Sequence, residues 1–199
     1  AQVQALTTTQ APALGATQLQ GLSADSAKGL ESQDLGKLTG SAVAGLSTTV
    51  VQGLSSGLLA GLSSTQVGSL TNAQVQALST TQLDKLGTAQ AVGLSATQLG
   101  ALSTASVVAM NTDAVGALSA ASLVGLSSTQ VGALTSTQLQ ALNTTQAGGL
   151  AAVGAAGLSS GQLSAMDSQD LAKLGVTVVS ALRSDALVGL SGTQMTALS

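Results

Sequence analysis

The chain has 199 residues and carries little charge, with five Lys and Arg against eight Asp and Glu and a net charge of −3. It contains no His, no Cys and no Phe, Trp or Tyr. Imidazole bases, thiolate nucleophiles and the usual nitrogen and sulfur metal ligands are therefore missing. We expect no enzyme activity, and no catalytic, cofactor-binding or metal site. Without a basic surface or aromatic stacking platforms, we also expect no nucleic-acid binding.

An eight-residue repeat begins at the N-terminus and runs without an insertion to the C-terminus. Every eighth residue from Leu6 onward is Leu or Met, and every eighth residue from Val3 onward is Val, Leu, Ala or Met. The chain, residues 1–199, is therefore predicted to be a single array of 25 octads. Because the frame reaches both ends without a polar terminal cap, we expect the array to be an excerpt of a longer one.

Each octad also carries a helix start signal. Ser or Thr followed three residues later by Gln is a capping box, as in Ser63 with Gln66 and in Thr135 with Gln138. The cap column holds Ser, Thr, Asn or Asp at 19 of its 25 positions, and the column three residues on in the repeat holds Gln at 13 of its 25 positions. The pattern predicts a chain of helices of one to two turns, each too short to persist without stacking on others.

Glycine suggests a larger unit. The residues at every eighth position from Leu6 and from Val3 form two apolar columns. In the position directly after the column that begins at Val3, Gly recurs at spacings that are multiples of sixteen: Gly36, Gly68, Gly100, Gly116, Gly132 and Gly148. We therefore predict an all-α solenoid in which octads pair into 16-residue units of two mini-helices. Leu would lie between two layers, with Ala or Gly where backbones approach. The alternative is a β-solenoid, which the many Thr and Val residues favour. Strand alternation would, however, place the two apolar columns on opposite faces.

Three octads replace the expected Gln with an apolar residue, at Val50, Leu58 and Val178. Either these side chains extend the core, or they form a lateral self-association surface between copies of the chain.

Charged residues lie three apart in three places: Asp25 with Lys28, Asp34 with Lys37, and Asp170 with Lys173. This spacing places both side chains on one helix face, so we predict surface ion pairs that contribute little to stability.

The octad Leu-Ser/Thr-Thr-x-Gln-Leu/Val-x-Ala-Leu, as in residues 78–83 and 94–99, resembles the repetitive regions of very large bacterial surface or secreted proteins. Such proteins are often described as adhesin-like or haem-utilisation proteins. The resemblance implies an extracellular or cell-surface location and an extended, non-catalytic role. Haem binding finds no support, because the chain lacks His, Tyr and Cys as axial ligands.

We therefore predict a structural repeat protein that serves as a spacer, fibre or filament-forming subunit and associates with copies of itself. No run of eighteen apolar residues occurs, so we expect no transmembrane segment, and we expect no small-molecule ligand. The alternative function is a binding solenoid, with an adhesin ligand or an ice-binding face built from Thr and Ser rows.

Overall fold

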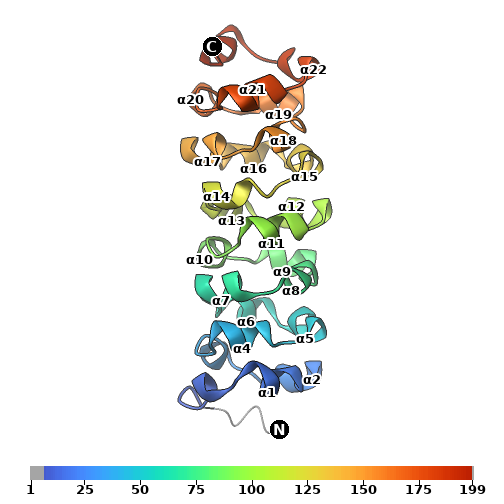
Figure 1. Cartoon of the computed structure of the whole chain (residues 1–199), viewed down its shortest axis with the longest axis vertical. Helices are drawn as coiled ribbons and strands as arrows, with labels where there is room; N and C mark the ends of the chain where they lie inside the picture. The colour runs from blue at the N-terminus through green and yellow to red at the C-terminus, as the bar shows by residue number, and fades with distance from the viewer. Residues whose placement is uncertain (1–6, 199) are drawn as a thin grey trace.

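The computed structural model describes residues 7–198 and shows an elongated stack of short helices, in which chain order follows the length of the rod (Figure 1). A 3₁₀-helix, Ala11–Ala13, comes first, and no strand occurs in the described residues. The α-helices are α1 (Ala16–Gln20), α2 (Ala24–Ala27), α3 (Ser32–Leu35), α4 (Gly40–Ala44), α5 (Thr48–Gly53), α6 (Ser56–Ala60), α7 (Ser64–Ser69), α8 (Asn72–Gln76), α9 (Thr80–Asp84), α10 (Thr88–Ala91), α11 (Ala96–Ala101), α12 (Thr104–Ala109), α13 (Thr112–Ala117), α14 (Ala120–Leu123), α15 (Ser128–Ala133), α16 (Ser136–Gln140), α17 (Thr144–Gly148), α18 (Ala152–Ala155), α19 (Ser160–Ala165), α20 (Ser168–Leu171), α21 (Val176–Ala181), α22 (Ser184–Leu187) and α23 (Gly192–Ala197).

Each octad forms one helix, and α11 shows how. Its N-cap, Ser95, is extended, and its Oγ accepts a hydrogen bond from the backbone N–H of Gln98 at 3.3 Å. The helix ends where Leu102 returns to extended backbone. A cap contributes on the order of 1 kcal/mol, so capping defines the helix boundaries but cannot alone stabilise a helix this short.

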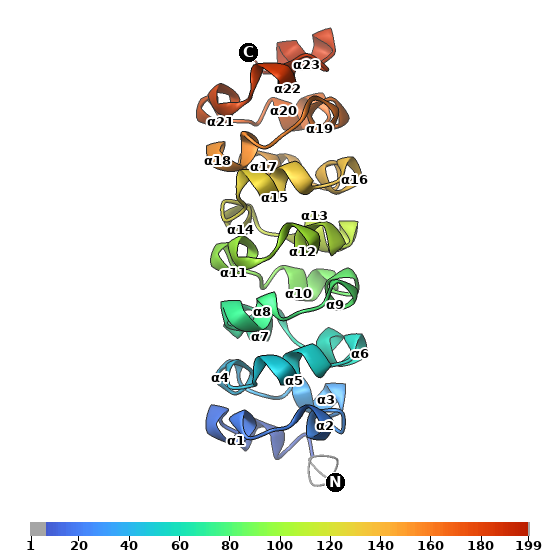
Figure 2. The same cartoon turned by 90° about the vertical axis from the view of Figure 1, so that its right-hand side faces the viewer.

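The two apolar columns supply the remaining stability by forming one continuous core. For α11 these residues are Leu99 within the helix, which is fully buried, and its C-cap Leu102, which is 4% exposed. Burying such a side chain contributes about 1.5–3 kcal/mol, which exceeds the contribution of a cap. Figure 2 shows the helices arranged around the long axis, with the same stacking along the rod. The all-α solenoid of short capped helices is confirmed, and the β-solenoid alternative is wrong.

The packing period differs from the predicted one. The helices that pack against each other between successive turns are three places apart in the chain, from α1 with α4 to α20 with α23. Close contacts between successive turns join residues 25 to 31 apart, and these offsets lie between three and four octads. One turn therefore holds more than three helices around a common core. The predicted pairing into 16-residue, two-layered units is wrong, because odd and even octads make the same cross-turn contacts.

Small residues do lie where backbones approach, as predicted. A Cβ built on Gly100 would lie 2.7 Å from the carbonyl oxygen of Gly125 in the next turn. A Cβ on Gly125 would in turn overlap the carbonyl of Ala96. Gly at these two positions therefore allows the backbones of neighbouring turns to approach each other closely.

Candidate functional site

The most distinctive polar feature of the fold is a set of buried glutamines in the third position of the helices. In α11, the Gln98 side chain is 2% exposed, and its Oε1 accepts a hydrogen bond from the backbone N–H of Ser95 at 2.8 Å. This is the returning half of the capping box. The same pair of cap bonds forms at α7, α8, α9, α15, α16, α17, α19 and α23.

The other end of each glutamine connects two turns of the solenoid. Gln98 Nε2 donates to the backbone carbonyl of Leu70, 28 residues earlier, at 2.7 Å. We call the ten bonds with this offset the glutamine ladder; in each, the acceptor belongs to the Leu/Met column and the N···O distance is 2.6–2.8 Å. The donors are Gln66, Gln74, Gln82, Gln90, Gln98, Gln130, Gln138, Gln146, Gln162 and Gln194.

The ladder is interrupted at α18 and at α20–α22, and also in α12–α14, where the third positions hold Ser106, Ala114 and Ser122. The N-cap Asn111 compensates in part. Its Nδ2 donates to the carbonyl of Leu86 at 2.9 Å, which is the acceptor that a glutamine at position 114 would reach. The hydroxyls of Ser106 and Ser122 bond instead within their own octads.

Two aspartates occupy the glutamine position, and the structure corrects the role predicted for them. The Asp25–Lys28 surface pair is confirmed at 2.8 Å. Asp34 and Asp170, however, are 5% and 6% exposed. In the described part of the chain, neither pairs with the lysine three residues later. Both aspartates occupy the inward-facing position of the octad that the ladder glutamines take elsewhere, whereas Lys37 and Lys173 are exposed.

Asp170 shows the consequence of this placement. Burial, with a smaller contribution from the negative charge of Asp167, raises the pKa of the Asp170 carboxyl above its ordinary value. The Asp167 side chain is the N-cap of α20 and accepts a hydrogen bond from the backbone N–H of Asp170 at 2.9 Å. Asp170 therefore holds its proton more readily than an exposed aspartate does, and in the protonated form its carboxyl, like the amide of Gln, has a donor.

The three apolar residues predicted as a self-association surface do not lie together on the exterior. Val50 is fully buried, Val178 is 5% exposed, and Leu58 is half-buried against the core. Val50 and Val178 fill the inward position that Gln takes elsewhere. These two side chains therefore belong to the core and do not form the predicted contact between copies.

The N-terminal residues of the helices contribute much of the exposed surface. Threonines at the second helical position are exposed in several octads, among them Thr65, Thr97, Thr129 and Thr137. Charge is sparse, and the closest ion pairs besides Asp25–Lys28 are between neighbours in sequence, such as Lys85 with Asp84 at 2.9 Å. The described exterior thus offers hydroxyls and methyl groups rather than charged clusters.

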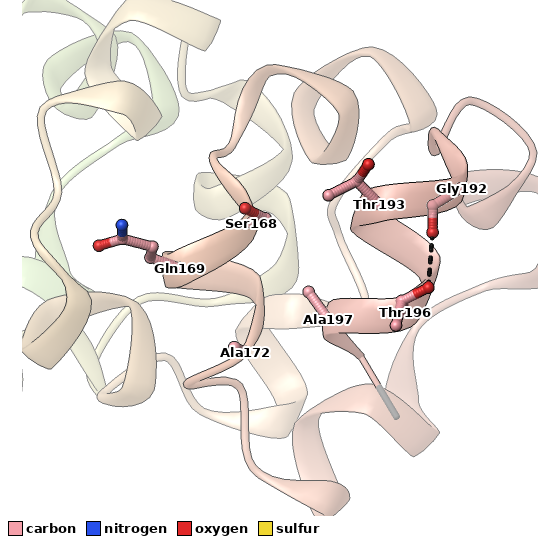
Figure 3. Close-up of a pocket in the computed structure, with 7 residues that line it drawn as sticks. All are labelled: Ser168, Gln169, Ala172, Gly192, Thr193, Thr196 and Ala197. Carbon is pink, nitrogen blue, oxygen red and sulfur yellow. Dashed lines mark hydrogen bonds between the residues drawn. The ribbon is translucent and has the colours of Figure 1, made fainter.

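A shallow hollow lies between α20 and α23 near the C-terminal end (Figure 3). Its lining includes Ser168, Gln169 and Thr193, and Thr196 Oγ1 donates to the Gly192 carbonyl at 2.9 Å beside it. These groups are neutral, and they include no acid, base or cation. The chemistry they offer is limited to hydrogen bonding and apolar contact.

Comparison with known proteins identifies a repeat region. Residues 107–144 match the family described as the ALTTAQ repeat, a span that includes α13–α16. No curated protein matches the chain. Within residues 7–198, no helix has both the length and the apolar character needed to cross a lipid bilayer. The match agrees with the predicted repeat protein, whereas adhesin-like character remains an expectation from the resemblance.

Proposed function

We propose that the chain is a non-catalytic structural repeat protein that acts as a spacer or filament-forming rod. The observation that carries this proposal is the glutamine ladder, which runs from Gln66 to Gln194. Where it is present, it uses mostly buried polar groups to join a turn to the previous one. Together with the continuous apolar core, it gives successive turns a defined separation, which is what a spacer requires.

The bacterial and extracellular setting of this rod rests on the resemblance of the octads to bacterial surface proteins. Labelling of intact cells of the source organism with an antibody against the chain tests it. Surface labelling without permeabilisation is expected, whereas labelling that requires permeabilised cells would contradict it.

The spacer function is tested by changing the number of octads and measuring length by small-angle X-ray scattering. Deleting residues 64–87 removes three octads and keeps the frame, so the maximum dimension should fall in proportion to the octads removed. Deleting residues 64–67 instead is the control, since it breaks the frame and should reduce helical content. A compact particle for the intact chain, or a length that does not follow octad number, would contradict the proposal.

A binding solenoid is the second candidate, and the exposed threonines at the second helical position favour it. Regularly spaced hydroxyl and methyl groups could bind ice or a polymeric ligand. Thermal hysteresis of a dilute solution tests the ice-binding form, and freezing without hysteresis would rule against it.

A further inference from the structure

We propose that the rod contains built-in joints. These are turns of the solenoid that lack the glutamine ladder, and they recur at intervals of 64 residues. At these turns the rod opens and bends more readily than in the segments between them. This inference rests on the proposed rod and states where along its length the rod yields.

The third helical position, which holds Gln in the ladder, lacks Gln in three sets of three consecutive octads. Each set begins 64 residues after the one before it, and none of the 13 Gln residues of this column falls in a set. The sequence between the sets repeats at the same distance, since residues 61–68 and 125–132 are identical. The interruption is therefore a periodic feature of the chain. The three sets are Ala42, Val50 and Leu58; Ser106, Ala114 and Ser122; and Asp170, Val178 and Ala186.

Three consecutive helices extend almost once around the solenoid, so one set removes the ladder from nearly a whole interface between turns. Helices α12, α13 and α14 pack against α9, α10 and α11, near the middle of the rod (Figure 2). Within the described residues, one side chain bonds to a Leu-column carbonyl across this interface, from Asn111 to Leu86 at 2.9 Å. Across the next interface, α15, α16 and α17 make three ladder bonds of 2.6–2.8 Å.

The α12–α14 interface also leaves two carbonyl acceptors without a donor. Leu78 and Leu94 are 6% and 2% exposed, and no group in residues 7–198 donates a hydrogen bond to either carbonyl oxygen. Ser106 and Ser122 stand where Gln would reach them, but their hydroxyls bond within their own octads. Separating the two turns would give water access to both carbonyls. Opening therefore gains hydrogen bonds at this interface, whereas it breaks them at a ladder interface.

Apolar contacts hold the α12–α14 interface, and they restrict movement less than the ladder does. Val107 and Val115 are 2% and 1% exposed, so the core continues through this turn. Apolar burial is non-directional, whereas a hydrogen bond weakens steeply as its angle departs from linear. The turn can therefore tilt while its side chains stay in the core. A rod built in this way bends at the ladder-free turns and keeps a defined spacing between them.

The test is amide hydrogen exchange of the 199-residue chain, measured by mass spectrometry of its peptides. Amides in α12–α14 should exchange roughly tenfold faster than those in α8–α10 and α15–α17, because local opening costs less there. Fraying from the chain ends gives the opposite order, since α12–α14 lies in the middle of the array. Fast exchange at this place therefore distinguishes a joint from fraying.

Ser106→Gln combined with Ser122→Gln supplies donors for the two unpaired carbonyls and should remove the fast exchange. Ala105→Gln combined with Ala121→Gln is the matched control. Both alanines are exposed, one position earlier in the same helices, so this pair should keep the fast exchange.

Gln130→Ser combined with Gln146→Ser is the reverse change, and it decides the matter if the longer side chains do not fit in α12 and α14. It removes two ladder donors and should make exchange in α15–α17 roughly tenfold faster. Uniform exchange from α8 to α17 in the unmodified chain, or unchanged exchange in this reverse variant, would overturn the proposal. Small-angle X-ray scattering separates this test from that of the rod: an elongated particle with uniform exchange refutes the joints alone, whereas a compact particle refutes the rod as well.

Discussion

Gln98 and Leu70 are joined across one turn of the solenoid, with the side-chain amide donating to the backbone carbonyl at 2.7 Å. The same amide group closes the cap of its own helix, because its oxygen accepts from the backbone N–H of Ser95. A single buried side chain thus satisfies one donor and one acceptor that would otherwise be orphaned. Where it repeats along the chain, this relationship couples the local start of a helix to the stacking of turns.

Replacing Gln98 with Glu separates these two roles. The carboxylate keeps the acceptor for the cap, but at neutral pH it has no donor and places a buried negative charge beside the Leu70 carbonyl. We expect Gln98→Glu to lower the free energy of unfolding at pH 7 by about 1–3 kcal/mol, as measured by urea denaturation.

The matched control for this change is Gln52→Glu, because Gln52 is exposed near the end of α5. Its cost should stay within a few tenths of a kcal/mol, from the negative charge near a helix C-terminus. Equal costs at the two positions would show that the ladder bond contributes nothing to stability.

Ser95, Gln98 and Leu70 show which parts of the structure the octad sequence predicts and which it does not. The cap between Ser95 and Gln98 depends only on local spacing, so the sequence was sufficient to predict it. The bond to Leu70 depends on how many octads make one turn, and that number arises from packing around the core. A signal for it was present: a capping box accepts Glu as well as Gln, yet Glu never occupies this position in the 25 octads. Only the amide can donate across the turn.

Asp34 and Asp170 are buried, although their spacing from a lysine predicts surface ion pairs. Spacing from a lysine indicates which residues share a helix face, but it does not say which face is inside. The place of both aspartates in the glutamine column settles that question, and their burial follows from it.

Asp170 makes the stability of the solenoid depend on pH. Burial raises the pKa of its carboxyl above the ordinary value of 3.8, so the folded chain binds this proton more tightly than the unfolded chain. The resulting stabilisation is fully present below about pH 3.8 and is lost as the pH rises through the folded-state pKa. Helices α17 and α23, which pack against α20, contain no charged residue, so the groups to consider are Asp167 and Lys173.

Asp170→Asn should remove this dependence. The amide is neutral at every pH and keeps a donor, so the free energy of unfolding should vary less between pH 3 and pH 7 than in the unmodified chain. Urea denaturation at a series of pH values measures it. Gln169→Asn, an exposed neutral change next to it, should leave the pH dependence as it is. If Asp170→Asn keeps the pH dependence of the unmodified chain, a group other than Asp170 causes that dependence.

Gly125 should tolerate no side chain. A Cβ there would overlap the Ala96 carbonyl of the preceding turn, so the two turns would have to separate. We expect Gly125→Ala to cost about 1–3 kcal/mol, the usual cost of overpacking, as measured by thermal or urea denaturation.

Gly161 provides the comparison, because a Cβ built on it has no neighbour within 4 Å. Gly161→Ala should stabilise α19 by up to about 1 kcal/mol through helix propensity. If both variants lose stability equally, the close approach between turns does not restrict residue size at Gly125.

The interruption of the ladder at α12–α14 predicts a local weakness that can be repaired. Ser106 is 8% exposed, and its hydroxyl bonds to the Ser103 hydroxyl at 2.8 Å rather than to the preceding turn. The ladder offset of 28 residues would bring a glutamine at this position to the Leu78 carbonyl. Because an added hydrogen bond contributes about 1 kcal/mol net, Ser106→Gln should raise the free energy of unfolding by about that amount and slow amide hydrogen exchange in α12.

Ala105→Gln is the matched control, because it adds the same side chain at an exposed position and should change neither quantity. Matching results for the two variants would show that the ladder position has no special role, and destabilisation by Ser106→Gln alone would show that this turn has no room for the longer side chain.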